Sequence, residues 1–191
     1  MIEEYVDCLK NDGVLAYPTD TVYGLCVRFD HQAACEHLRN VKHRPLEKSF
    51  PIMVSDVAQL KLIAEVNEDD LKLVARYMPG PITLILKKKR IIEPWMNDGK
   101  ETIAVRMACD ETLKAIIDEL QVPIFMTSAN KSGEPVLQDA QSIAAQLAVD
   151  KIYVGKPKGE KASTIVDCVN GYKVVREGVI TQKMIDETIG G

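Results

Sequence analysis

Short apolar runs rich in Val and Ile alternate along the chain with segments whose apolar residues recur at helical spacing. This alternation is typical of an α/β protein, in which helices cover a sheet. The pattern predicts strands at Val14–Tyr17, Leu25–Phe29, Phe50–Val54, Thr83–Lys87, Thr102–Arg106, Ile124–Met126, Ile152–Val154, Thr164–Val166 and Lys173–Arg176. It predicts helices at Ile2–Lys10, Gln32–Val41, Val57–Ile63, Glu68–Tyr77, Glu111–Leu120, Ala140–Ala148 and Gln182–Thr188.

The predicted strands outnumber the predicted helices, and several strands follow one another directly. Because parallel neighbours need a long crossover between them, this order favours a twisted, mixed sheet flanked by helices. Short polar side chains at Asp30, Asn67 and Asp110 are expected to cap the helices that follow them. The segment MPGP, Met78–Pro81, ends a helix because proline cannot continue it and glycine permits the turn.

The chain has 191 residues, 46% of them hydrophobic, and no long polar linker interrupts it. We therefore expect a single domain, residues 1–191, built on one substantial core. No run approaches the roughly 20 apolar residues that span a bilayer, and no leader-like segment begins the chain. These features predict a cytoplasmic protein without a membrane partner. With a net charge of −4, any contact with nucleic acid would need a local basic patch.

The five cysteines are widely spaced, and none forms a C-x-x-C pair. This spacing argues against a disulfide framework and against a zinc knuckle. We expect buried, reduced thiols.

The segment PTDTVYGL, Pro18–Leu25, follows an apolar strand with a turn rich in hydroxyl groups. Open α/β folds bind small ligands at such strand ends, where backbone N–H groups and hydroxyls gather. Asp20 and Gly24 alone would be ordinary turn residues. The hypothesis of a site here therefore depends on complementary groups elsewhere in the chain.

A basic segment, KHRP at Lys42–Pro45, follows the end of a predicted helix, and Lys48 comes shortly after it. Three cations converging on one loop, with Arg44 able to form bidentate hydrogen bonds, suit a polyphosphate or a carboxylate. The same spacing also fits cations that only stabilise a helix C-terminus.

In TSANKSG, Thr127–Gly133, polar side chains again follow an apolar strand. Ser128 and Asn130 are candidates to hold phosphate or ribose oxygens. An ST- or Asx-turn that only caps the loop explains the same residues equally well.

Three more strands carry polar residues at their ends. Thr102 and Arg106 are an even number of residues apart, so they lie on the same side of the strand TIAVR. STIVD at Ser163–Asp167 and VVREG at Val174–Gly178 repeat the pattern. Such residues are either solvated strand ends or contacts to a ligand.

Several catalytic signatures are missing. The chain contains no G-x-x-x-x-G-K-[ST], no G-x-G-x-x-G and no G-x-S-x-G. His31, His37 and His43 lack the spacing of a metal site, so no metal ligands are expected in the protein. The candidate groups are cations, hydroxyls and amides, which bind and stabilise charge but are poor nucleophiles.

Taken in order, the segments PTDTVYGL, K-x-RP, MPGPITLIL, TIAVR, TSANKSG, STIVD and VVREG resemble the YrdC/TsaC family of L-threonylcarbamoyladenylate synthases. The resemblance runs from about Val14 to Gly178. It includes the K-x-R and S-x-N signatures of the family, and it implies a YrdC-like fold.

The resemblance implies an enzyme, a nucleotidyltransferase that condenses L-threonine, bicarbonate and ATP to threonylcarbamoyl-AMP and pyrophosphate. This product leads to threonylcarbamoyladenosine (t6A) in tRNA, which implies a threonylcarbamoyl transferase complex as partner and leaves direct tRNA contact open. The substrate carbamate attacks the α-phosphorus, which accounts for the missing protein nucleophile. Mg²⁺ is expected to arrive on the phosphates, since the chain offers no Asp/Glu cluster.

Roles carry over by matching position. The resemblance implies catalytic roles for Lys42, Arg44, Ser128 and Asn130. It implies ATP contacts at Arg44, Lys48, Thr102, Ser128, Asn130 and Arg176. It implies L-threonine contacts at Thr21, Arg106 and Ser163.

The chain departs from the family pattern at several positions. Met53 stands where some relatives have a histidine near the threonine hydroxyl, and Met78 stands where tryptophan usually precedes PGP. The residues Met107-Ala108-Cys109 replace a proline-containing turn. The path of that turn and the partner of the threonine hydroxyl are therefore not given by the resemblance.

Two other functions are considered. A non-catalytic RNA-binding or ribosome-maturation module of the same fold would use Lys87–Arg90 and the scattered lysines Lys151, Lys156, Lys158 and Lys161. A carbamoyl-transfer domain of hydrogenase-maturation proteins is disfavoured, because those domains occur in longer chains with zinc-finger modules that this chain lacks.

Overall fold

The computed structural model describes residues 2–45, 48–159 and 161–191. Within this part of the chain, one nine-stranded sheet has the order β7-β1-β2-β6-β3-β5-β4-β8-β9. The strands are β1 (Leu15–Pro18), β2 (Tyr23–Arg28), β3 (Ile52–Val54), β4 (Ile82–Lys87), β5 (Thr102–Met107), β6 (Ile124–Ser128), β7 (Lys151–Ile152), β8 (Thr164–Asp167) and β9 (Lys173–Arg176). The helices are α1 (Glu3–Lys10), α2 (Gln32–Lys42), α3 (Val57–Ile63), α4 (Glu68–Tyr77), α5 (Pro94–Asn97), α6 (Glu111–Leu120), α7 (Ala140–Gln146) and α8 (Gln182–Ile189).

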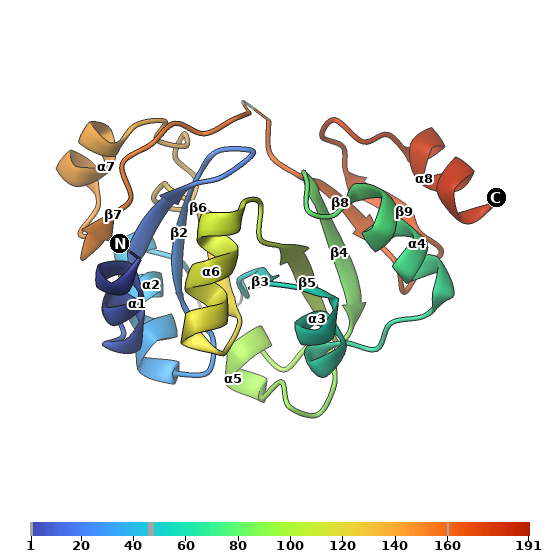
Figure 1. Cartoon of the computed structure of the whole chain (residues 1–191), viewed down its shortest axis with the longest axis horizontal. Helices are drawn as coiled ribbons and strands as arrows, with labels where there is room; N and C mark the ends of the chain where they lie inside the picture. The colour runs from blue at the N-terminus through green and yellow to red at the C-terminus, as the bar shows by residue number, and fades with distance from the viewer. Residues whose placement is uncertain (1, 46–47, 160) are drawn as a thin grey trace.

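The sheet is mixed, which confirms the predicted fold class. Strand pairs β1–β2, β2–β6, β3–β6, β4–β5 and β8–β9 are antiparallel, whereas β1–β7, β3–β5 and β4–β8 are parallel. Figure 1 shows α1 and α6 side by side over the half of the sheet that contains β1, β2 and β6, and α4 and α8 together at the other end. Helices thus cover both halves of the sheet.

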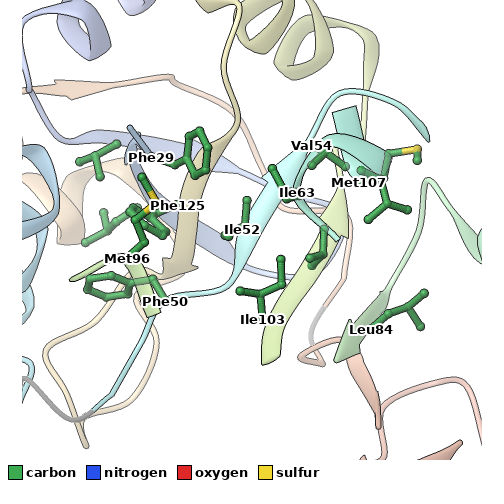
Figure 2. Packing of buried hydrophobic residues seen from close by; sticks show 14 of the residues in the cluster. Phe29, Phe50, Ile52, Val54, Ile63, Leu84, Met96, Ile103, Met107 and Phe125 are labelled. Atoms are coloured by element: carbon green, nitrogen blue, oxygen red, sulfur yellow. The ribbon is translucent and has the colours of Figure 1, made fainter. Parts of the chain in front are cut away.

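Successive residues of the central strands enter two different cores. On β1, Leu15 and Tyr17 pack with α1 and α6, while Ala16 packs into the larger cluster on the opposite face. Because both faces are covered, all four residues of β1 are buried, which explains why its sequence reads as a continuous apolar run. Figure 2 shows part of the larger cluster, in which the ring of Phe125 lies 6.0 Å from that of Phe50 and 6.2 Å from that of Phe29.

The strongest local signals gave the most accurate boundaries. Helices α3, α4 and α6 and strand β9 have the predicted limits, and Asn67 and Asp110 cap α4 and α6 by accepting from backbone N–H groups. The short helix α5 escaped prediction, because four residues are too few to show a period.

The prediction that Asp30 caps α2 is wrong. His31 occupies the N-cap position of α2 and makes no side-chain cap bond. Both carboxylate oxygens of Asp30 instead accept from the Arg28 guanidinium, at 2.8 and 2.9 Å. The carboxylate of Asp30 thus serves the bidentate pair with Arg28, and α2 begins one residue later than a cap at Asp30 would require.

Candidate functional site

A cavity of about 700 Å³ lies on the face of the sheet that also carries α1 and α6. The strand register places its floor residues on that one face, because directly opposed residues point to the same side. Gly24 opposes Ser128, Met53 opposes Arg106, and Ile165 opposes Arg176. Six residues implicated by the sequence, from separate segments, line this cavity: Thr21, Arg44, Arg106, Ser128, Ser163 and Arg176.

The turn of the PTDT segment is organised by Thr19. Its Oγ1 accepts from the backbone N–H groups of Thr21 and Val22, both at 3.2 Å, and donates to the Val22 carbonyl at 2.6 Å. Thr19 therefore stabilises the turn, and both Thr19 and Thr21 line the cavity. Gly24 also lines the cavity. A side chain would not fit there, since a Cβ would come within 2.4 Å of the Met126 sulfur.

Arg106, at the end of β5, is held by backbone and side-chain oxygens from two loops. Its Nη1 donates to Thr21 Oγ1 at 3.1 Å, and its Nη2 pairs with the Asp20 carboxylate. Its Nε and Nη2 also donate to the Gly80 carbonyl at 3.3 and 3.2 Å. The MPGP turn thus serves the site as well as ending α4, because it aims this carbonyl at Arg106.

Arg44 follows α2, and its side chain contacts backbone carbonyls further along the same loop. Its Nε donates to the Lys48 carbonyl at 3.0 Å and its Nη2 to the Ser49 carbonyl at 2.9 Å, while the guanidinium lies over the Phe50 ring at 4.9 Å. Burial, and then repulsion by Arg39, lowers the pKa of Arg44. All these partners are uncharged, so the positive charge of Arg44 is available to an anion in the cavity.

Lys42 lies beneath the TSANKSG loop and is only 1% exposed. Its Nζ donates to the carbonyls of Ser128 and Asn130 at 2.5 and 2.7 Å and to Asn130 Oδ1 at 3.1 Å. Burial, reinforced by the nearby Arg44 charge, lowers the pKa of Lys42 to about 7. Lys42 therefore fixes the loop that carries Ser128.

Asn130 works with Lys42 to hold the same loop. Its Oδ1 accepts from Ser128 Oγ at 2.6 Å, and its Nδ2 donates to the Glu134 carbonyl at 2.7 Å. Because the Ser128 hydroxyl proton is used in this bond, its oxygen lone pairs remain to accept from a ligand.

The motifs STIVD and VVREG meet through hydrogen bonds between Arg176 and Ser163. Arg176 Nε donates to the Ser163 carbonyl and its Nη2 to Ser163 Oγ, both at 3.0 Å, and Ser163 Oγ is 2.8 Å from Thr83 Oγ1. Gly178 allows this close approach, since a Cβ there would lie 2.6 Å from the Ala162 carbonyl oxygen. Burial, and then repulsion by Arg106, lowers the pKa of Arg176.

Four of the implicated residues do not line the cavity: Lys42, Lys48, Thr102 and Asn130. Of the three cations in this segment, Arg44 lines the cavity, whereas Lys42 is buried under the TSANKSG loop and Lys48 is exposed. Thr102 lies on the same face of β5 as Ala104 and Arg106, but beyond the end of the cavity.

The cavity also has walls that the motifs did not indicate. Pro135, Val136 and Gln138 come from the segment after TSANKSG, and no period or motif marks them. Met53 lines the cavity as well, so its thioether forms part of the wall. Ser49, Thr83 and Gln138 are additional lining residues with side-chain hydrogen-bonding groups that the sequence had not singled out.

None of the cavity-lining residues in the described part of the chain is Asp or Glu, and no group of three or more His, Cys, Asp or Glu side chains is placed to hold a metal ion. No described helix has the length and apolar character needed to cross a membrane.

These observations define a class of protein: a mixed α/β fold with an arginine-rich cavity, of a size that accepts a nucleotide, over one face of its sheet. The family model Sua5_yciO_yrdC, which is described as "Telomere recombination", matches residues 7–178. The chain belongs to this Sua5/YciO/YrdC family.

Two curated relatives and one solved structure illustrate the relationship. The chain is 34% identical over 188 residues to a threonylcarbamoyl-AMP synthase of Bacillus subtilis (95% of this chain, 54% of that protein). It is 31% identical over 176 residues to a threonylcarbamoyl-AMP synthase of Coxiella burnetii (89% and 94%). Its fold matches P. abyssi Sua5 complexed with L-threonine at a TM-score of 0.92 and 29% identity, covering 99% of this chain and 57% of that one. The chain thus spans little more than half of the B. subtilis and P. abyssi proteins.

Proposed function

We propose that this protein is an L-threonylcarbamoyladenylate synthase, a transferase that forms threonylcarbamoyl-AMP and pyrophosphate from L-threonine, bicarbonate and ATP. The observation that carries the proposal is the meeting of six implicated side chains, from segments spread over most of the chain, in one cavity of about 700 Å³. The names of the two curated relatives support the same activity.

The chemistry needs positioning and charge stabilisation more than a protein nucleophile. The threonine amine combines with bicarbonate to form a carbamate and water, and a carbamate oxygen then attacks the α-phosphorus of ATP while pyrophosphate leaves. Arg44 and Arg176, whose described partners are uncharged oxygens, suit the phosphates. Ser128 contributes hydroxyl lone pairs at the same wall.

The amino acid fits the part of the cavity that lies beside Arg106. Thr21, Arg106 and Ser163 offer hydroxyls and a guanidinium that suit the carboxylate and hydroxyl groups of L-threonine. Lys42 and Asn130 act as positioning residues, because they hold the Ser128 loop from below. ATP contacts by Lys48 and Thr102 would require the ligand to extend past the present cavity walls.

Mg²⁺ enters this proposal with the nucleotide. Since the described cavity lining carries no carboxylate, the ion would be held by phosphate oxygens and water. Its charge would add to that of Arg44 and Arg176 in neutralising the phosphate chain.

The cellular setting follows from the product. An activated, labile acyl-adenylate calls for a threonylcarbamoyl transferase acting on tRNA, which makes the cytoplasm the expected location. The RNA-binding alternative is not favoured, since the curated relatives are named as synthases. Its basic segment is also partly engaged, because Lys88 and Lys89 donate to the carbonyls of Ile92 and Lys61.

A direct assay tests the activity. Purified protein is incubated with ATP, Mg²⁺, bicarbonate and L-threonine, and pyrophosphate is measured together with incorporation of labelled bicarbonate into an AMP adduct. We expect release that depends on both L-threonine and bicarbonate. Pyrophosphate release that does not change when L-threonine is omitted would refute the proposal. Arg44→Ala should abolish most of the signal, whereas Arg28→Ala, which removes an arginine outside the cavity, should retain it.

A further inference from the structure

The three arginines that line the cavity differ in how their charge is balanced. In the described part of the chain, Arg44 donates only to backbone carbonyls and Arg176 only to Ser163 oxygens. Arg106 alone of the three forms an ion pair, with Asp20. Among the described residues, two of the cavity arginines therefore have no carboxylate partner, and the third is paired with Asp20.

Asp20 is well placed to act on the cavity without lining it. Its side chain is 16% exposed, and that of Arg106 is 10% exposed. One carboxylate oxygen, Oδ1, accepts from Arg106, while Oδ2 is buried and has no hydrogen-bond partner among the described residues. A buried carboxylate with one oxygen unpaired exerts a strong local field.

The contacts of Arg106 limit what it can give to a ligand. Its Nε–H and both Nη2 N–H groups are used by Gly80 and Asp20, and one Nη1 N–H is used by Thr21. One N–H on Nη1 remains. Arg106 can therefore offer a ligand carboxylate a single hydrogen bond instead of a two-pronged clamp, so it holds a plain anion weakly.

We propose that Asp20 is a specificity-determining residue that makes the Arg106 end of the cavity select a zwitterionic amino acid over a simple carboxylate. The inference rests on the proposed function for the identity of the amino acid. The ligand carboxylate takes the remaining N–H of Arg106, and the ligand ammonium is stabilised by the negative charge of Asp20. Phosphate groups are left to Arg44 and Arg176, neither of which forms an ion pair with a described carboxylate.

The test compares two ligands that differ only in the amine: L-threonine and 3-hydroxybutanoate, its analogue without the amino group. Binding to the full chain is measured by calorimetry without ATP, so no turnover is required. We expect the wild-type protein to bind L-threonine at least about tenfold more tightly than 3-hydroxybutanoate. Asp20→Asn, which keeps the shape and removes the charge, should reduce this ratio to about twofold or less.

A matched control is available at the C-terminal end of β2. Asp30→Asn also removes the carboxylate partner of an arginine, Arg28, but neither residue lines the cavity. It should leave the ligand ratio unchanged. Asp20→Glu, which restores the charge, should retain a preference for L-threonine.

The results distinguish a role of Asp20 in selecting the ligand from a role only in holding Arg106. If Asp20→Asn weakens both ligands by the same factor, Asp20 only holds Arg106 in place and the proposal is overturned. The same conclusion follows if the wild-type protein binds the two ligands equally or fails to bind L-threonine, a result that does not depend on any variant folding. Discrimination by a protein that lacks synthase activity would uphold this inference and refute the proposed function alone.

Discussion

Two loops that border the cavity are held in place by opposite electrostatic means. The PTDT loop is fixed to β5 by an ion pair, in which Arg106 meets Asp20. The TSANKSG loop is fixed to α2 by a lone amine, because Lys42 meets only carbonyl and amide oxygens. Both cations are buried, at 8% and 1% exposure.

The difference predicts how each loop responds to mutation and to pH. The Arg106–Asp20 pair joins two opposite charges that are both largely buried, so it is costly to break on one side only. The amine of Lys42 has a pKa lowered to about 7 by burial, so the support of the second loop changes its charge near neutrality.

The largest expected effect on stability comes from breaking the ion pair on one side. Arg106→Met leaves the Asp20 carboxylate buried without a partner, and we expect it to lower the free energy of unfolding by about 3–5 kcal/mol. Urea denaturation of the wild-type and variant proteins measures this loss.

The double variant Arg106→Met/Asp20→Asn serves as the control for that experiment. Removing the second charge should recover at least half of the loss, since no buried carboxylate then remains unpaired. Losses that simply add in the double variant would show that the two side chains stabilise the fold independently.

A smaller effect is expected at the other loop. Lys42→Met removes a buried amine but leaves three oxygens without their donor, and we expect a loss of about 2 kcal/mol. Hydrogen exchange should show faster opening at the TSANKSG loop than at the PTDT loop. Equal acceleration at both loops would contradict a local role for Lys42.

The same pair of proteins tests the pKa of Lys42. Because the pKa is lowered from 10.5 to about 7 in the folded state, the unfolded chain binds more protons between these values, and stability rises with pH through this window. The stability gap between wild type and Lys42→Met should therefore widen from pH 7 to pH 9, by about 1 kcal/mol per pH unit. A gap that is constant over this range would mean that the buried amine keeps its ordinary pKa.

The burial of Lys42 shows what the sequence analysis could have recognised. A lysine in KHRP suggests a surface cation, yet Lys42 follows Leu38 by four residues and so lies on the buried face of α2. The helical period thus indicates that Lys42 is buried, whereas the basic motif suggests that it is exposed. The predicted boundaries of α3, α4 and α6, in contrast, rest on period and caps that do not depend on distant residues.

The Asp20–Arg106 pair shows what local patterns do not contain. The two residues are 86 positions apart, and they meet although β6 and β3 lie between β2 and β5 in the sheet. Alternation along TIAVR predicts which face Arg106 occupies, but it does not predict which strands become neighbours. Strand order is set by the packing of the whole sheet, which also decides that Gln138 reaches the cavity and that Thr102 stays outside it.

The smallest expected effect on stability separates the two functions of the TSANKSG loop. Lys42 holds Ser128 through its backbone carbonyl and not through its hydroxyl, so Ser128→Ala should leave the Lys42 contacts intact and cost about 1 kcal/mol or less. If Ser128 Oγ accepts from the nucleotide, the same variant should raise the KM for ATP more than the KM for L-threonine. Thermal unfolding and steady-state kinetics on one preparation measure both quantities. A large loss of stability would assign Ser128 to the support of the loop, because the hydroxyl would then matter before any ligand binds.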